Sequence, residues 1–227
     1  MDTKGSWVTL LYCDNVNGLS KKQYADLLAF VSEQRKNKIL KYLKLEDRIL
    51  GLTSFALLNY GLHMKGLLSL DFSYSTNQYG KPYVRGSMFE FNISHTNNAI
   101  ACAIANTTVG VDIQEKIYEY QNVMEYVCSS SEIEHISASI SPVECFTKLW
   151  TLKESYVKCI GTGIWDGLEH LDFSLMSNDC GNMYGYYFHY IIEKEYCLSV
   201  CSTEKKIEIR KISLGELLRY VLISSNN

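Results

Sequence analysis

The chain lacks several features that would place it in other classes of protein. Its 227 residues contain only two prolines, Pro82 and Pro142, so Pro-rich linkers between domains are absent. No apolar run reaches the roughly 20 residues that span a bilayer. A basic surplus is also missing, because the formal net charge is -3, whereas nucleic-acid-binding proteins usually carry a strong positive excess. We therefore expect neither a membrane partner nor a nucleic-acid partner.

Cysteine residues are present without any pattern of pairing. The eight cysteines include no CxxC pair, and no apolar leader with a cleavage site precedes them. Because Cys packs as a small apolar residue and disulfides are rare in the cytosol, we expect reduced thiols in a cytoplasmic protein. The hydrophobic content of 47% is ample for a substantial core.

Patterns typical of strands and helices follow one another in an order that occurs twice along the chain. Hydrophobic periodicity predicts strands at 7–12, 89–93, 99–104 and 108–113 and helices at 21–31, 33–43 and 47–64. After them it predicts a helix at 132–137, a long helix from 142 to 160, strands at 171–175, 184–191, 196–201 and 206–212, and a closing helix at 214–222. We therefore predict an α+β fold of two similar halves, 1–106 and 107–227, with the site residues at their interface.

The long helix is marked at both ends and carries two charged residues on one face. The run Ser141-Pro142-Val143-Glu144 predicts a capping box with proline at the first helical position, and Gly161 predicts the end of the helix. Glu154 and Lys158 are four residues apart, so they lie on the same face. In isolation, a pair of this kind is most often a surface ion pair.

A carboxylate in the strand at 108–113 adds a second signal. Asp112 lies in an apolar strand, where aspartate is costly to bury without a partner. The alternative is a strand end whose carboxylate faces water. A strand carboxylate that faces a helix carboxylate, here Glu154, presents the oxygen ligands that Mg²⁺ takes together with substrate phosphates. The two acids therefore predict a magnesium site.

Four blocks of the sequence resemble the signature of a known family. Val109-Gly110-Val111-Asp112 and the run WTLKESYVKCIGTG at 150–163 are similar to the motifs (V/I)G(V/I)D and WxxKE(S/A)xxKxxGxG of the 4′-phosphopantetheinyl transferase superfamily. Tyr79-Gly80-Lys81-Pro82 and Phe91-Asn92-Ile93-Ser94-His95 resemble the GKP and FNxSH blocks of its larger, surfactin-synthetase-activating (Sfp-type) members. The blocks follow the order of the family from residue 79 to residue 163.

The resemblance implies a monomer whose halves are related by a pseudo-twofold axis, with coenzyme A bound in the cleft between them. It implies that Asp112 and Glu154 hold Mg²⁺, or Mn²⁺ in its place, and that Lys158 lies near the reacting diphosphate. In the first half, it implies that the phosphates of coenzyme A contact Arg48, Lys81, Ser94 and His95, besides Lys158 from the second half. Arg48 belongs to a basic stretch in which the resemblance fixes no register for the other cations, Arg35, Lys36, Lys38, Lys41 and Lys44. Glu132 resembles a further acid near the site.

One position departs from the family pattern. Many relatives carry a second acid two residues after the aspartate, whereas this chain has Gln114 followed by Glu115. Because side chains alternate along a strand, residues 112 and 114 point to one side and residue 115 to the other. We expect Gln114 to offer its amide oxygen to the metal or to hold a metal-bound water. The site would then carry one negative charge less than in those relatives.

The resemblance implies transfer of the phosphopantetheine arm of coenzyme A to a serine of an acyl, peptidyl or aryl carrier protein, with release of 3′,5′-ADP. The serine hydroxyl would lose its proton to Glu154 or to a metal-bound water, and Lys158 would stabilise or protonate the leaving group. One alternative is a coenzyme A-dependent acyltransferase, which would attack the thioester and would need no metal at Asp112 and Glu154. The other is a catalytically silent coenzyme A-binding module, an alternative suggested by Gln114 at the position where many relatives carry the second acid.

Overall fold

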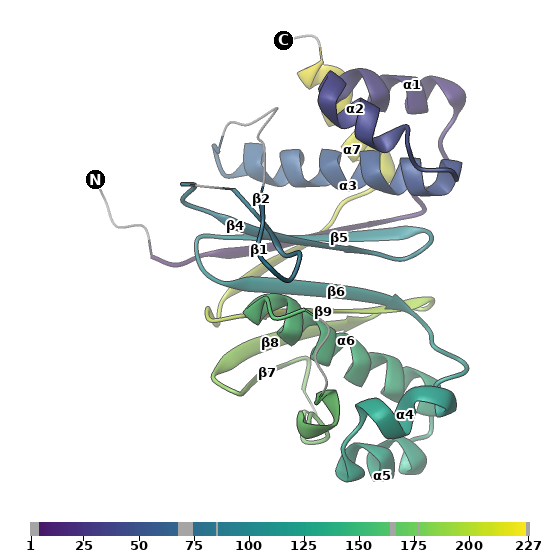
Figure 1. Cartoon of the computed structure of the whole chain (residues 1–227), viewed down its shortest axis with the longest axis vertical. Coiled ribbons are helices and arrows are strands. Elements are labelled where there is room, and N and C mark those ends of the chain that lie inside the picture. Colours follow the sequence, from purple (N-terminus) through teal and green to yellow (C-terminus); the bar gives the residue numbers. More distant parts are fainter. Residues whose placement is uncertain (1–4, 68–74, 85, 164–166, 177, 226–227) are drawn as a thin grey trace.

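The computed structural model describes residues 5–67, 75–84, 86–163, 167–176 and 178–225. These residues form four layers, in which two four-stranded sheets lie back to back and each is covered by helices on its outer side (Figure 1). Among the described helices, none is long and apolar enough to cross a bilayer. All eight cysteines are free thiols, as predicted.

The first sheet has the strand order β10-β1-β5-β4. Its strands are β1 (Val8–Asp14), β4 (Glu90–His95), β5 (Ala99–Ala105) and β10 (Ile207–Lys211). The helices that cover it are α1 (Lys21–Phe30), α2 (Glu33–Ile39), α3 (Leu45–Met64) and α7 (Leu214–Ser224). The core of this half is centred on α3, because its apolar residues Leu52, Leu57 and Leu62 are completely buried.

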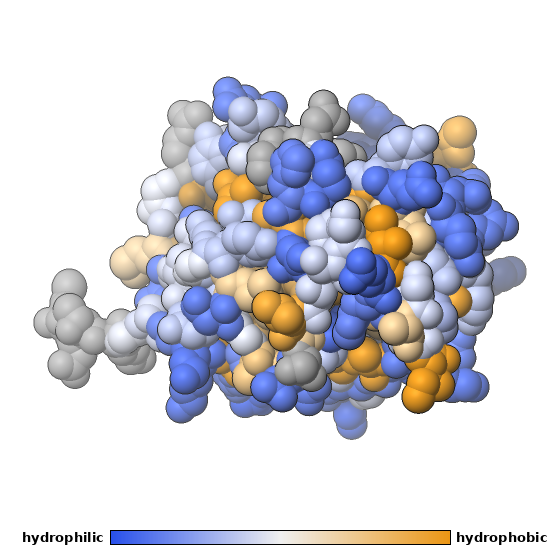
Figure 2. Space-filling view, turned by 90° about the horizontal axis from the view of Figure 1, so that it is seen from below, coloured by the Kyte–Doolittle hydropathy of each residue, from blue (hydrophilic) through white to orange (hydrophobic). Residues whose placement is uncertain are grey.

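The second sheet has the strand order β6-β9-β8-β7. Its strands are β6 (Val109–Glu115), β7 (Cys180–Met183), β8 (Tyr186–Ile192) and β9 (Tyr196–Ser202). Its outer side carries α4 (Gln121–Val127), α5 (Ser130–Ala138), α6 (Pro142–Ile160) and the 3-10 turn η1 (Leu168–His170). A short hairpin of β2 (Ser75–Thr76) and β3 (Pro82–Tyr83) stands apart from both sheets. Seen from below, the surface shows separate apolar residues among hydrophilic ones (Figure 2).

The two sheets pack on each other through alternate residues of β1, β5, β6 and β9. The residues of β5 in this layer are all alanines, whose short side chains allow the sheets to approach closely. In β6 the layer takes Val109, Val111 and Ile113. Because strand side chains alternate, Gly110, Asp112 and Gln114 point the other way, towards α6.

The two halves repeat one arrangement of strands. In the first, β1 pairs with β5 and β5 with β4, and in the second, β6 pairs with β9 and β9 with β8, all antiparallel. In each half the first strand is followed by helices, of which the longest comes last. The predicted α+β fold with two similar halves is therefore confirmed. The domain boundary near residue 106 stays a prediction. The last strand and helix do not follow it, because β10 pairs in parallel with β1 and α7 packs against α1 and α3 of the first half.

The strand predicted at 171–175 is not formed. Leu171 and Phe173 are buried, as the alternating pattern requires. However, the Leu171 carbonyl accepts a hydrogen bond from Lys153 Nζ at 2.6 Å, and the Phe173 N–H donates to Glu132 Oε1 at 2.9 Å. Backbone groups that a strand would offer to its neighbour are thus taken by buried side chains, and the segment is a loop.

The start of α6 also differs from the prediction. Ser141 makes no side-chain cap hydrogen bond, so the predicted capping box is wrong, although Pro142 occupies the first helical position. Glu144 instead forms an ion pair with Lys116 at 2.6 Å. Gly161 ends the helix in the left-handed conformation, as predicted, with φ of 73°. The helix predicted at 33–43 ends earlier, at residue 39, and α4 and β7 have no counterpart among the predicted elements.

A glycine allows β6 to lie directly against α6. A Cβ atom on Gly110 would lie 2.2 Å from both the Ser155 carbonyl oxygen and the Cys159 nitrogen. Backbone atoms of a helix cannot move aside as the end of a flexible side chain can, so only glycine fits here. Because Asp112 lies two residues further on the same side of β6, this contact brings its carboxylate to the face of α6 that carries Glu154 and Lys158.

The contact predicts a large effect of a single added methyl group. Gly110→Ala should lower the free energy of unfolding by about 3 kcal/mol or more, because overpacking here displaces helix backbone. Urea denaturation followed by circular dichroism measures the change. Gly215→Ala in α7 is the control, since no atom lies within 4 Å of its added Cβ, and it should leave stability unchanged or raise it by about 0.5–1 kcal/mol. Equal stability of Gly110→Ala and wild type would contradict the close packing of β6 on α6.

Candidate active site

Two side chains of β4 satisfy backbone amides of β6. The Asn92 side-chain oxygen accepts a hydrogen bond from the Val111 N–H at 2.8 Å, and the Ser94 hydroxyl accepts one from the Ile113 N–H at 3.4 Å. Because residues two apart share one side of a strand, the Asn-x-Ser spacing in β4 matches the spacing of the two amides. This contact joins the two sheets and sets Ser94 beside Asp112. No role of Asn92 was predicted from the sequence, although its two-residue spacing from Ser94 is a usable signal.

Asp112 is the buried centre of the site. Its side chain is 0% exposed, and its Oδ1 accepts hydrogen bonds from Lys158 Nζ at 2.5 Å and from the Ser94 hydroxyl at 2.9 Å. Lys158 Nζ also donates to Ser94 Oγ at 3.0 Å, and the Gln114 side-chain nitrogen donates to Asp112 Oδ2 at 3.2 Å. A carboxylate is stable in such a place only with partners of this kind. The alternative of a strand-end carboxylate facing water is excluded.

Glu154 approaches Asp112 from α6. Burial raises the pKa of the Glu154 carboxyl, and the negative charge of Asp112 raises it further, while Lys158 acts in the opposite direction. Thr147 and Thr151, on the same face of α6, are completely buried, so this face is turned towards β6. Glu154 and Lys158 therefore belong to a partly buried cluster with Asp112 and do not form an isolated surface pair.

The donor set fits one divalent cation completed by substrate. Within the described ranges, no group of three or more His, Cys, Asp and Glu side chains could hold a metal ion by itself. Asp112 and Glu154 supply two carboxylates, and the pKa of Glu154 is raised first by burial and then by the negative charge of Asp112, against the opposing effect of Lys158. Two carboxylates completed by phosphates and water are typical of Mg²⁺ sites in proteins.

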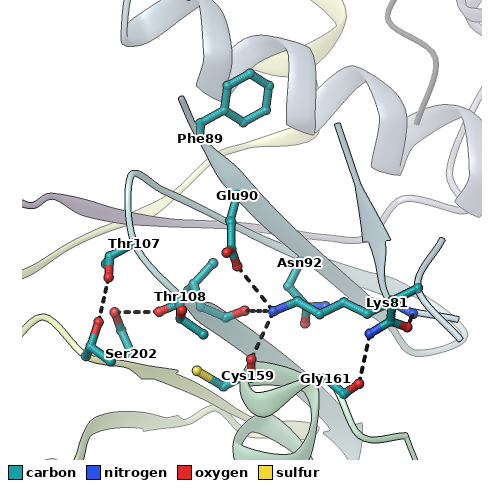
Figure 3. Close-up of polar contacts among 12 residues, drawn as sticks. Lys81, Phe89, Glu90, Asn92, Thr107, Thr108, Cys159, Gly161 and Ser202 are labelled. Carbon is teal, nitrogen blue, oxygen red and sulfur yellow. Dashed lines mark hydrogen bonds and ion pairs between the residues drawn. The ribbon is translucent and has the colours of Figure 1, made fainter. Parts of the chain in front are cut away.

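Lys81 is held by three acceptors of the protein itself. Its Nζ donates to the carbonyl oxygens of Cys159 at 2.9 Å and Val109 at 3.2 Å, and it pairs with the Glu90 carboxylate at 3.3 Å (Figure 3). It thus connects β4, the first residue of β6 and the end of α6. The contact with coenzyme A phosphates expected for Lys81 stays a prediction.

A cavity of about 270 Å³ lies beside the end of β4. Its wall includes His95, two cations of α2, Arg35 and Lys38, and apolar side chains of α2, α3 and β4. Arg35 and Lys38 are thus the members of the basic stretch that reach this cavity, a register that the sequence left open. Arg48 is not among the described residues that line it, and its Nε donates to the Tyr42 carbonyl at 2.8 Å. The predicted phosphate contact of Arg48 therefore remains untested.

Glu132 has a structural place in the core of the second half. It pairs with Lys153 at 2.6 Å, and both side chains are buried. Its other contacts are the capping box with Ser129 at the start of α5 and the Phe173 N–H. Lys153 also donates to the carbonyls of Val127 at the end of α4, of Leu168 in η1 and of Leu171 just after η1. The pair was not predicted from the sequence, although a lysine within the apolar face of a long helix indicates a buried acidic partner.

Comparison with known proteins matches the part of the chain that carries the acid cluster. The profile of the 4′-phosphopantetheinyl transferase superfamily covers residues 108–210, which include Asp112, Glu154 and Lys158. The 4′-phosphopantetheinyl transferase gsp of Aneurinibacillus migulanus is 30% identical over 166 residues, 70% of this chain and 68% of that protein. The chain belongs to the 4′-phosphopantetheinyl transferase superfamily.

Two further members of the superfamily extend the match over most of the chain. A 4′-phosphopantetheinyl transferase of Bacillus subtilis is 27% identical over 202 residues, 81% of this chain and 87% of that protein. The 4′-phosphopantetheinyl transferase Sfp of Bacillus subtilis strain 168 is 24% identical over 218 residues, 88% of this chain and 95% of that protein. These matches confirm the predicted resemblance to Sfp-type members and identify the chain as a transferase. They favour neither the acyltransferase nor the silent binding module.

The charge balance at Asp112 predicts opposite effects of two substitutions that keep side-chain size. Glu154→Gln removes a carboxylate whose ionisation is unfavourable in the folded protein, so Tm should rise by about 2–4 °C at pH 7.5, or about 1 kcal/mol. Gln114→Glu replaces the donor to Asp112 Oδ2 by a second negative charge, so Tm should fall by a similar amount. Differential scanning calorimetry without divalent cations measures both changes.

A pH series is the control for this prediction. A carboxyl group with a raised pKa in the folded state costs stability only where it is ionised. The advantage of Glu154→Gln over wild type should therefore shrink as the pH falls through the raised pKa towards the ordinary glutamate value of about 4.3. A difference that does not vary with pH would contradict the placement of the Glu154 carboxyl in a buried, negatively charged site.

Proposed function

We propose that the chain transfers the 4′-phosphopantetheine arm of coenzyme A to a serine of an apo acyl, peptidyl or aryl carrier protein and releases 3′,5′-ADP. The observation that supports this most is the convergence of Ser94, Asp112, Glu154 and Lys158, from β4, β6 and α6, at one point. Ser94 and Lys158 are 64 positions apart in the chain and 3.0 Å apart in space. The separate sequence blocks of the superfamily thus meet in a single site.

The nucleotide part of coenzyme A has a suitable cavity next to this point. Ser94 and His95 are consecutive at the end of β4, so their side chains point to opposite faces of the strand. Ser94 contacts Asp112, whereas His95 lines the cavity with Arg35 and Lys38. We propose that coenzyme A lies across the end of β4, with its 3′-phosphate at these three side chains and its diphosphate towards Lys158. Charge-assisted contacts of this kind contribute about 1.5–3 kcal/mol each.

We further propose that the metal ion is Mg²⁺, with Mn²⁺ as a substitute that prefers the same ligands. Asp112 and Glu154 would hold it together with the phosphates of the substrate. When bound, the ion neutralises negative charge on the diphosphate. We propose Gln114 as a third residue of this site. Its side-chain oxygen would face the metal, as predicted from the sequence, while its side-chain nitrogen donates a hydrogen bond to Asp112 Oδ2.

The side chains of the site can carry out the proton transfer that the reaction needs. Because its pKa is raised, Glu154 is a stronger base than an ordinary glutamate and would accept the proton of the serine hydroxyl. The serine oxygen then bonds to the β-phosphorus as the bond from that phosphorus to 3′,5′-ADP breaks. The ammonium group of Lys158, held by Asp112 and Ser94, stabilises the charge on the leaving phosphate. No covalent intermediate with the enzyme is required.

The assembly state and location of the enzyme are also proposals. We propose that the enzyme acts as a monomer, as the family resemblance implies. The eight free thiols support the cytoplasm as its location, because thiols stay reduced there.

Intact-mass analysis of carrier proteins tests the proposed reaction. We expect a panel of apo acyl, peptidyl and aryl carrier proteins, incubated with the enzyme, coenzyme A and Mg²⁺, to include one that gains the mass of a phosphopantetheine arm. Glu154→Gln and Asp112→Asn should lower the rate by a factor of about 100 or more, as expected for loss of a group that stabilises the transition state. Lys22→Met, at an exposed position on α1, is the control and should retain full activity.

The same experiment separates the alternatives. With acetyl coenzyme A, a phosphopantetheinyl transferase adds the whole acetylated arm and requires the divalent cation. Gain of the acetyl group alone, insensitive to a chelator, would identify an acyltransferase. Binding of coenzyme A without any change in the mass of the carrier would support the silent module.

The cavity at α2 predicts which cations recognise the 3′-phosphate. Titration calorimetry with coenzyme A and with 3′-dephospho-coenzyme A should show that Lys38→Ala reduces the preference for the 3′-phosphate about tenfold, equivalent to about 1.4 kcal/mol. Arg48→Ala should have a smaller effect, because its guanidinium group is engaged with the Tyr42 carbonyl. Loss of the preference in Arg48→Ala together with no change in Lys38→Ala would instead favour the Arg48 contact that the family resemblance implies.

A further inference from the structure

We propose that Lys81 is a positioning residue, which fixes the end of α6 against the start of β6, and that its ammonium group does not bind the phosphates of coenzyme A. The inference rests on the proposed function, because it gives Lys81 a part in the same reaction. It differs from the role that the family resemblance implies for this lysine. The reason lies in the contacts that Lys81 makes within the protein.

The ammonium group of Lys81 already has a complete set of acceptors. A lysine carries three N–H donors, and Lys81 Nζ has three acceptors in Cys159 O, Val109 O and the Glu90 carboxylate, at 2.9, 3.2 and 3.3 Å. The side chain is only 15% exposed. A phosphate could bind Nζ only by displacing one of these acceptors, and it would then approach the negative charge of Glu90.

Two of the three acceptors of Lys81 belong to the elements that carry Asp112, Glu154 and Lys158. Cys159 directly follows Lys158 near the end of α6, where the last carbonyls of a helix have no partner within the helix. A cation is favourable at this end of a helix. Val109 is the first residue of β6, three positions before Asp112. Lys81 thus ties the last turn of α6 to the start of β6 (Figure 3).

A second side chain of the same hairpin binds the same helix end. Asn77 accepts hydrogen bonds from the N–H groups of Tyr79 and Lys81, both at 2.9 Å, and its side-chain nitrogen donates to the Gly161 carbonyl at 2.9 Å. The aliphatic stem of Lys81 packs beside Gly161, where an added Cβ would lie 3.1 Å from the lysine Cδ. The turn between β2 and β3 is therefore built as a cap for α6, and Lys81 is the charged part of that cap.

Two substitutions of Lys81 separate positioning from phosphate binding. Lys81→Met keeps the length of the side chain and removes all donors, whereas Lys81→Arg keeps the charge in a planar group that does not suit three divergent acceptors. For a positioning residue, kcat with an apo carrier protein at saturating coenzyme A should fall by about 10- to 100-fold in both variants. The Kd of coenzyme A, measured by titration calorimetry at a stoichiometry near one, should change less than about threefold. Lys22→Met is the matched control for loss of one positive charge.

A phosphate ligand predicts the opposite pattern. Lys81→Met would then weaken coenzyme A binding tenfold or more, Lys81→Arg would resemble wild type, and kcat would recover at saturating coenzyme A. Either the weakened binding or the rescue by arginine would overturn the inference.

Hydrogen exchange gives a readout that does not depend on turnover. Amides at 155–163 should exchange faster in Lys81→Met than in wild type and in Lys22→Met, because the end of α6 has lost its anchor. Unchanged exchange in this segment would also overturn the inference. If wild type modified no carrier protein, the proposed function would fail, while exchange and coenzyme A affinity would still decide the role of Lys81.

Discussion

The close approach of β6 and α6 at Gly110 is the constraint on which the arrangement of the site depends. Asp112 and Lys158 can form an ion pair at 2.5 Å only because the helix backbone at 155–159 rests directly on the strand. A wider separation would leave Asp112 buried without its cation, a state that costs about 3–5 kcal/mol. Packing and electrostatics are therefore coupled in this protein. The absence of a side chain at Gly110 permits the contact between β6 and α6 that brings Lys158 to the buried carboxylate of Asp112.

Two buried ion pairs on α6 illustrate how a structural charge differs from a functional one. Lys153 is 1% exposed, and beside its pair with Glu132 it makes further hydrogen bonds to three backbone carbonyls near the ends of α4 and η1. Lys158 is 29% exposed, and beside its pair with Asp112 lies Glu154, whose pKa is raised. Negative charge that the protein leaves partly unbalanced, at a place that solvent and ligand can reach, is typical of a site that binds a cation. The pair of Glu132 and Lys153, whose charges have protein partners, instead joins α6 to α5 and to the backbone around α4 and η1.

The sequence predicted those features that arise from local patterns. Periodicity predicted α3 and β5 nearly to the residue, Pro142 and Gly161 marked the ends of α6, and the motif blocks predicted that Asp112, Glu154 and Lys158 share one site. Features that depend on partners far apart in the sequence could not be predicted. The loop at 171–175 looks like a strand because its apolar residues alternate, yet Lys153 and Glu132 take its backbone groups. The direction of the Lys81 ammonium group likewise depends on carbonyls of residues 28 and 78 positions away.

Other gaps have the same physical origin. No residue of α4 is fully buried, so its sequence carries little periodic signal. The basic stretch before α3 has cations both on α2 and on the turn after it, and only the packing of α2 decides that Arg35 and Lys38 face the cavity. A motif states which residues are present, whereas their partners follow from packing.

The place of β10 in the first sheet has a consequence for how the enzyme is made. β10 is the neighbour of β1, and the Ile212 N–H binds the Tyr12 carbonyl at 2.8 Å, although some 200 residues separate them. The segment that follows contributes Leu217, Leu218 and Val221 to the core of the first half. During synthesis on the ribosome, the first half therefore waits with an open sheet edge and an unfilled core until this segment emerges. The site at the interface of the two sheets then matures late, and a chain that stops before β10 leaves the first half incomplete.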